Sequence, residues 1–402
     1  MKGILLNILL ILCSLSLWGK NPSEAVDQFV RESGINTNSV AVKIIDLSDG
    51  TVTASHNSMQ PLIPASILKA VTTASLIGES GPDWRYHTRV YIDGPNDLGR
   101  LRGNLIVAGS CDPSLNSDHE PFSKDFIEEI CEALAAQMIR EIEGNIIIDQ
   151  SEFQGNSRPT SWAAGDKKKY YGTGTHALNY RDNCEGDFSV ENPSLSFIKE
   201  LKSALASNGI ILEEKELTEG PRIQIHDHLS APIDEIMRSC MMRSDNMFAE
   251  SMLRTYGKMK GLSGETGEAA SMELDAWTAK QLPMEGIVIV DGSGLSRSNR
   301  VTADFMGELL TLMSSNPTYA SFFPLAGQEG TLRKFLAETP LDSYIAMKTG
   351  SMNGIQCYAG YKLDDEYVPT HAVVIIMNDI PNNRDRVKKA AEKMLLSIFI
   401  NE

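Results

Sequence analysis

Three short motifs carry residue types that can act together as a nucleophile, a base and an anion-binding group. They are Ser66-Ile67-Leu68-Lys69, Ser244-Asp245-Asn246 and Lys348-Thr349-Gly350. A serine hydroxyl is a weak nucleophile until a base takes its proton, and a partly buried lysine can be neutral enough to do so. In this order along one chain, the motifs indicate an enzyme that opens an acyl bond through an ester with serine.

The first motif stands where a helix is expected to begin. Two prolines precede it, and residues 67–77 are apolar and compatible with a helix. A helix would place Lys69 on the same face as Ser66, one turn later, and its first-turn N–H groups would favour negative charge. We interpret Ser66 as the nucleophile and Lys69 as its base. An isolated motif of this kind is more often a capping serine and a surface lysine.

The second motif lies between two helical patterns. We expect Ser244 to relay protons and Asn246 to orient a substrate amide, whereas Asp245 should point into the structure. Lys348 of the third motif should modulate proton transfer by Ser244. The same triplet alone is a common turn or N-cap sequence.

The third motif follows a short β-rich run. Lys348 and Thr349 would hold a terminal carboxylate, and Gly350 would let a ligand backbone approach closely. The backbone N–H groups of Ser66 and Ser351 would then form an oxyanion hole.

The elements that must position these motifs come from both ends of the chain. We expect strands over residues 40–47, 51–56, 344–351, 356–362 and 371–377, and helices over residues 23–33 and 386–399. The economical arrangement is one antiparallel sheet flanked by the terminal helices and a helical lobe, an α+β fold. The long stretch between the first two motifs contains further strand-like runs. We therefore predict a discontinuous catalytic domain, residues 20–80 and 232–402, with a mainly β insertion over residues 81–231.

The N-terminus predicts export. Three residues with one positive charge precede an apolar run over residues 4–18, which is short for a membrane span and typical of a secretory signal over residues 1–19. The protein is thus expected in the periplasm or cell envelope. Lipidation of Cys13 stays open, although Leu12 is larger than such sites usually tolerate.

Composition excludes other classes. The formal charge of −16 argues against nucleic-acid binding, and 42% apolar residues argue against disorder.

Five cysteines remain after the signal, without C-x-x-C spacing, so we expect small buried side chains and at least one free thiol; any pairing stays open. His226 and His228 look like a metal pair, but no further ligand accompanies them in sequence. We predict neither a metal nor a cofactor.

Beyond the motifs, several phrases resemble the D-alanyl-D-alanine carboxypeptidase/endopeptidase family, the class C low-molecular-mass penicillin-binding proteins. These phrases are Gly81-Pro82-Asp83-Trp84, Asp112-Pro113-Ser114-Leu115, Asp291-Gly292-Ser293-Gly294-Leu295-Ser296-Arg297, Leu325-Ala326-Gly327 and Gly330-Thr331-Leu332. The resemblance implies a β-lactamase/transpeptidase-like fold with extra domains between the first two motifs. It also implies peptidoglycan stem peptides as substrates and β-lactam antibiotics as inhibitors.

Carried over residue by residue, the resemblance makes Ser66 the acylated nucleophile, Lys69 its base and Lys348 the carboxylate anchor, with Ser244 and Asn246 as relay and positioning groups. It further implies that Asp149 and Phe153, with Arg297 on the opposite wall, contact the side chain of the stem peptide's diamino acid. Asn353 stands where relatives can carry a longer polar residue.

Two other functions stay open. A serine β-lactamase or esterase can use the same fold, but the Glu-x-x-Leu-Asn string of class A β-lactamases is missing between the second and third motifs. A non-hydrolytic penicillin or peptidoglycan receptor would be expected to carry a membrane span after the signal. The carboxypeptidase-to-endopeptidase balance and the oligomeric state are not readable from the sequence.

Overall fold

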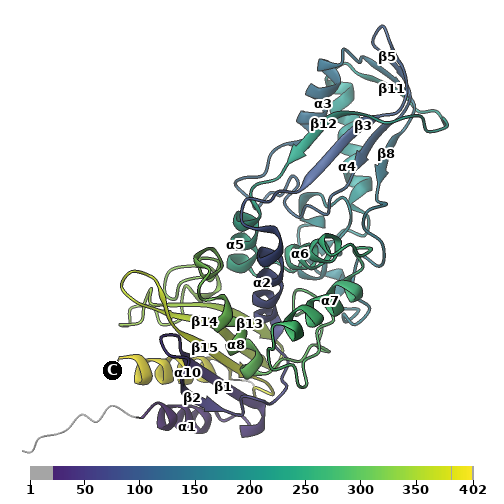
Figure 1. The fold of residues 1–402 in the computed structure, drawn as a ribbon. Coiled ribbons are helices and arrows are strands. Elements are labelled where there is room, and N and C mark those ends of the chain that lie inside the picture. Colours follow the sequence, from purple (N-terminus) through teal and green to yellow (C-terminus); the bar gives the residue numbers. More distant parts are fainter. Residues whose placement is uncertain (1–20, 382, 401–402) are drawn as a thin grey trace, which may run out of the picture.

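A computed structural model describes residues 21–381 and 383–400. The molecule is elongated, with a helix-covered sheet at one end, two smaller sheets at the other and a helical lobe between them (Figure 1). The predicted signal over residues 1–19, and with it Cys13, lies outside the described residues. Within the described ranges, no helix is both long and apolar enough to cross a membrane.

The large sheet is built from both ends of the chain, as predicted. Its strand order is β13-β14-β15-β1-β2, and all neighbours are antiparallel. The strands are β1 (Val40–Asp46), β2 (Val52–His56), β13 (Ile345–Met352), β14 (Ile355–Leu363) and β15 (Pro369–Met377). The N-terminal hairpin therefore pairs with the last strand, and β13, which carries the third motif, forms one edge.

Helices cover both faces of this sheet. The terminal helices α1 (Pro22–Ser33) and α10 (Arg384–Phe399) pack together on one face, where they bury Val42 and Ile44 of β1. The other face buries Ala41 and Ile45 against the lobe that contains α8 (Ala303–Met313). Side chains alternate across a strand, so a run of apolar residues indicates burial on both faces.

The helical lobe surrounds one buried helix, α2 (Lys69–Ser80), whose residues 69–77 are all buried. Around it lie α5 (Ile233–Arg243), α6 (Asn246–Met259) and α7 (Thr266–Ala279), together with the short α9 (Pro317–Ala320). This lobe places the first and second motifs beside the free edge of the large sheet.

Residues 87–229 form two four-stranded sheets and a small two-stranded one. The orders are β12-β3-β6-β8, β11-β7-β5-β4 and β10-β9. The strands are β3 (His87–Ile92), β4 (Asn96–Asp97), β5 (Arg100–Arg102), β6 (Leu105–Ala108), β7 (Glu141–Glu143), β8 (Ile146–Asp149), β9 (Cys184–Glu185), β10 (Phe188–Ser189), β11 (Ile211–Glu213) and β12 (Ile223–Leu229).

Two helices pack on these sheets, α3 (Phe126–Ala136) and α4 (Pro193–Ser207). Their core, centred on Phe126, Phe197 and Leu201, is separate from the two cores of the rest of the chain. A separate core supports our proposal of an inserted region over residues 81–231, although Tyr86, near its start, packs into the core of the helical lobe. The five described cysteines are free, and all except Cys184 are buried.

Candidate active site

The first motif straddles a change in helix type. Ala65–Leu68 form a 3₁₀ turn, η2, and α2 begins at Lys69. Ala65 has φ +47°, an uncommon backbone conformation for a residue with a Cβ, of the kind that clusters at functional sites. The turn holds Ser66 at the start of the buried helix, where unpaired backbone N–H groups are available.

Lys69 is the centre of a polar network inside the lobe. Its side chain is fully buried, and Nζ lies 3.0 Å from Oγ of Ser66, 2.6 Å from Oδ1 of Asn246 and 2.8 Å from the carbonyl oxygen of Ser293. Burial lowers the pKa of Lys69, although nearby acidic groups oppose the shift. A lowered pKa makes the neutral amine easier to reach, as a base that activates Ser66 requires.

A second lysine–serine pair lies in the same site. Nζ of Lys348, also fully buried, donates to Oγ of Ser244 at 2.9 Å. Ser244 follows α5 and has φ +61°, which turns its side chain toward the strand that carries Lys348. Burial holds the pKa of Lys348 well below its usual range, and the charge of Lys69 lowers it further.

The edge of β13 explains the third motif. The N–H of Met347 points off the free edge to the carbonyl oxygen of Pro324, and the two-residue period of a strand puts the N–H of Ser351 on the same edge. A Cβ at Gly350 would lie 2.5 Å from the carbonyl oxygen of Pro64 and 3.1 Å from the nitrogen of Ser66. Because Gly350 has no side chain, the turn that carries Ser66 can lie directly against β13. The sequence predicts instead that this space is for the backbone of a ligand.

Asn246 and Asp245 both serve the site. Asp245 caps α6 by accepting from the N–H of Phe248, as expected of a residue that points into structure, yet it also lines the pocket. Asn246 accepts from Lys69 and donates through Nδ2 to the carbonyl oxygen of Tyr171 at 2.7 Å. The second motif therefore connects the lobe to the inserted region.

Two buried acids, to which the sequence analysis assigns no role in the site, hold the segment whose carbonyl oxygen contacts Lys69. The buried Asp291 accepts from the N–H groups of Gly294 and Ser296, from Asn299 and from Nε1 of Trp162. These bonds fold the segment so that the carbonyl oxygen of Ser293 faces Lys69. A second buried acid, Glu250, accepts from the N–H groups of Gly292 and Ser293. Residues 291–297, one of the segments that resemble the family, therefore position the acceptor that holds Lys69.

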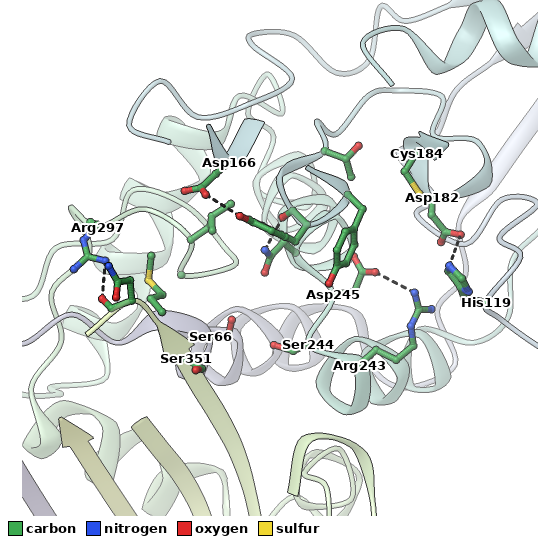
Figure 2. Close-up of a pocket in the computed structure, with 18 residues that line it drawn as sticks. Ser66, His119, Asp166, Asp182, Cys184, Arg243, Ser244, Asp245, Arg297 and Ser351 are labelled. Atoms are coloured by element: carbon green, nitrogen blue, oxygen red, sulfur yellow. Dashed lines mark hydrogen bonds and ion pairs between the residues drawn. The ribbon is translucent and has the colours of Figure 1, made fainter. Parts of the chain in front are cut away.

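Ser66, Ser244 and Ser351 open into one pocket with a volume of about 590 Å³ (Figure 2). Arg297 lies at one end and donates to the carbonyl oxygen of Asn353, while Arg243 lies toward the other end. The inserted region supplies much of the remaining wall, namely His119, Asp166, Tyr170, Tyr171, Thr173, Asp182 and Cys184. No motif marks these residues in the sequence.

The structure does not bring every predicted residue to the pocket. Asp149 ends β8 and pairs with Arg222 at 2.5 Å, and Phe153 packs with Cys111 and Ala177. Neither lines the pocket, whereas Arg297 does. Thr349 is nearly buried, and its hydroxyl bonds to Thr331 at 2.7 Å. An acid that faces the pocket from the inserted region is Asp166.

The sequence shows no further ligand beside the histidine pair, but the fold brings one to it. Glu129, almost a hundred positions earlier, contacts both His226 and His228. Sequence spacing could not show this contact because α3 and β12 meet only in the folded chain.

Comparison with known proteins agrees with this geometry. The sequence profile of the D-Ala-D-Ala carboxypeptidase 3 (S13) family matches residues 23–187 and 183–398. The chain belongs to this family. It is 22% identical to a D-alanyl-D-alanine carboxypeptidase of an Actinomadura species over 84% of this chain and 78% of the relative. It is 24% identical to the carboxypeptidase DacB of Haemophilus influenzae, over 79% and 80% respectively.

Solved structures show the same fold. Penicillin-binding protein 4 of Haemophilus influenzae superposes with a TM-score of 0.79 at 19% identity, covering 92% of this chain and 98% of that one. A predatory endopeptidase of Bdellovibrio bacteriovorus gives a TM-score of 0.57 at 17% identity, covering 90% and 94%. The predicted α+β transpeptidase-like fold is thereby confirmed.

Proposed function

We propose that this protein is a serine DD-peptidase that cleaves peptidoglycan stem peptides through an acyl-enzyme on Ser66. The observation that carries the proposal is a pair of lysine–serine contacts, Lys69 with Ser66 at 3.0 Å and Lys348 with Ser244 at 2.9 Å. Both serines line one pocket, and both lysines are buried behind them. Membership in the carboxypeptidase family and relatives named for that activity support the reaction class.

Acylation begins with proton transfer. Neutral Lys69 takes the proton of Ser66 as its oxygen attacks the carbonyl carbon between the last two D-residues of the stem peptide. The negative charge that develops on the carbonyl oxygen is stabilised by the N–H groups of Ser66 and Ser351. The resulting tetrahedral intermediate carries one new C–O bond and retains the scissile C–N bond.

The intermediate collapses when the leaving nitrogen gains a proton. Ser244 passes a proton to that nitrogen and is reprotonated from Lys348 or Lys69, so that D-alanine leaves as a neutral amine. Lys348, with Thr349, also binds the substrate's terminal carboxylate at this edge of the sheet, because that negative charge favours the protonated form of Lys348, which burial disfavours. Asn246 orients the amide. Water then attacks the ester and releases Ser66. Cleavage of a cross-link between stem peptides differs only in its leaving group.

Inhibition by β-lactam antibiotics follows from the same attack, because the lactam carbonyl presents a strained amide to Ser66. A β-lactam complex of penicillin-binding protein 4 of Haemophilus influenzae supports this assignment. Since peptidoglycan lies outside the cytoplasmic membrane, we also propose that the protein acts in the periplasm or cell envelope.

The experiment is release of D-alanine from a pentapeptide that ends in D-alanyl-D-alanine, measured with wild type and Ser66→Ala. The proposal predicts turnover by the wild type and none by the variant, together with a long-lived penicillin adduct. Rapid release of hydrolysed penicillin would instead identify a β-lactamase. Acylation without peptide turnover would identify a receptor.

A further inference from the structure

A second cluster of chemically capable side chains lies in the inserted region, remote from Ser66 in sequence and fold. His226 and His228 are two residues apart on β12, so both point to the face on which α3 packs. Glu129 stands on the first turn of α3. Oε2 of Glu129 lies 2.8 Å from Nε2 of His226 and 2.7 Å from Nδ1 of His228.

The three side chains converge on one point. Two imidazole nitrogens meet a single carboxylate oxygen, and the three atoms all lie within 4.8 Å of one another. Two imidazoles and one carboxylate form one of the ligand sets that Zn²⁺ prefers, with bonds of about 2.0–2.2 Å. A tetrahedral ion with such bonds separates its ligands by roughly 3.3 Å, so shifts of well under 1 Å would open the cluster to an ion.

The surroundings also suit a metal. The Phe126 ring, one turn before Glu129, packs 5.1 Å from the ring of His228 and 6.5 Å from that of His226, which restricts both imidazoles. The side chain of His228 is 4% exposed, whereas those of His226 and Glu129 are 26% and 21% exposed. The cluster therefore has a buried floor and one side that water and an ion can reach. No lysine or arginine is paired with Glu129 in the described ranges.

We propose that Glu129, His226 and His228 form a zinc site with three protein ligands and a fourth position open to water. Binding replaces the two hydrogen bonds by three coordinate bonds, and each neutral imidazole moves its remaining proton to the nitrogen that faces away from the ion. Any histidine that is protonated beforehand releases one proton. The ion ties the edge strand β12 to α3, and β12 leads directly into α5 and Ser244.

The role inferred for this ion is structural stabilisation of the inserted region, and it is independent of the proposed peptidase reaction. An ion bound only to the folded chain raises the melting temperature. At a hundredfold excess over Kd we expect a rise of roughly 5 °C.

The test uses the purified mature chain stripped with a chelator. Equilibrium dialysis and calorimetry with Zn²⁺ alone should give one ion per chain, and Co²⁺ alone should give the visible absorption of a four-coordinate nitrogen–oxygen site. His226→Gln and Glu129→Gln should weaken binding at least tenfold and abolish the zinc-dependent rise in melting temperature. His226 is the better first target because it is partly exposed.

His87→Gln is the matched control, since His87 lies on the neighbouring strand β3 and pairs with Asp227, which points away from the cluster. That variant should bind zinc like the wild type. The proposal is overturned if the wild type binds no zinc, or if the His226 and Glu129 variants bind it as tightly as the His87 variant. Penicillin labelling of the stripped and loaded protein should be equal, which separates this result from that of the peptidase assay.

Discussion

Substitution of Lys69 distinguishes a base from a mere positive charge. Lys69→Met keeps a similar apolar volume and removes the amine, whereas Lys69→Arg keeps the charge on a group that does not deprotonate in proteins. If Lys69 takes the proton of Ser66, both variants should lose acylation, although only one loses the cation.

The expected loss follows from the contacts of the amine. A positioned general base contributes roughly 10²–10⁴ in rate, equivalent to about 3–5 kcal/mol of the barrier. The methionine variant also leaves Oδ1 of Asn246 and the carbonyl oxygen of Ser293 without their donor, at about 1–3 kcal/mol each, offset by no longer burying an ammonium group. Activity should therefore fall much further than stability.

The assay is the second-order rate of acylation by a fluorescent penicillin, with melting temperature and circular dichroism measured on the same samples. We expect at least a hundredfold decrease for both variants, with their folds retained. Acylation of the arginine variant within tenfold of wild type would show that charge alone suffices, and would refute the role of Lys69 as a base.

Three further outcomes are expected. Ser351→Pro removes an N–H that points off the edge of β13, so the rate of acylation should fall about 10²–10³-fold. Ser351→Ala keeps this N–H and should retain most of the activity. Equal acylation rates for the two variants would exclude this amide from the oxyanion hole. Gly350→Ala should lower both melting temperature and acylation, because its Cβ would press on the turn at Ser66; an unchanged protein would show that this turn yields easily. Glu273 is fully buried, and burial raises its pKa to about 7 from 4.5 in the unfolded chain. Between these values the unfolded state loses its proton first, so stability should fall by about 3 kcal/mol as pH rises. For Glu273→Gln, the free energy of unfolding measured by chemical denaturation should differ less between pH 5 and pH 8 than it does for the wild type. An equal difference in the variant would show that other groups cause the pH dependence.

Much of the large sheet could be predicted because its signals are local. Alternating or continuous apolar runs mark β1 and β15, and each observed strand lies within two residues of its predicted range. The motifs likewise carry their own spacing, so the sequence alone suffices to place Ser66 and Lys69 one turn apart.

What could not be predicted depends on contacts between distant segments. The family resemblance implies that Asp149 contacts the substrate, but Arg222, which is remote in the chain, pairs with this carboxylate, and Asp149 does not line the pocket. The carbonyl oxygen of Ser293 that receives Lys69 has no side-chain signature, and neither has the approach of Glu129 to the two histidines. Such groups become visible only when the packing of α2, α3 and β12 is known.

The central claim is that Ser66 is the residue that becomes acylated. Mass spectrometry of the intact protein after incubation with benzylpenicillin, followed by peptide mapping, tests it directly. We expect one adduct per chain on the peptide that contains Ser66, and none on a folded Ser66→Ala variant. An adduct on any other residue, or one that persists in the variant, would contradict the claim.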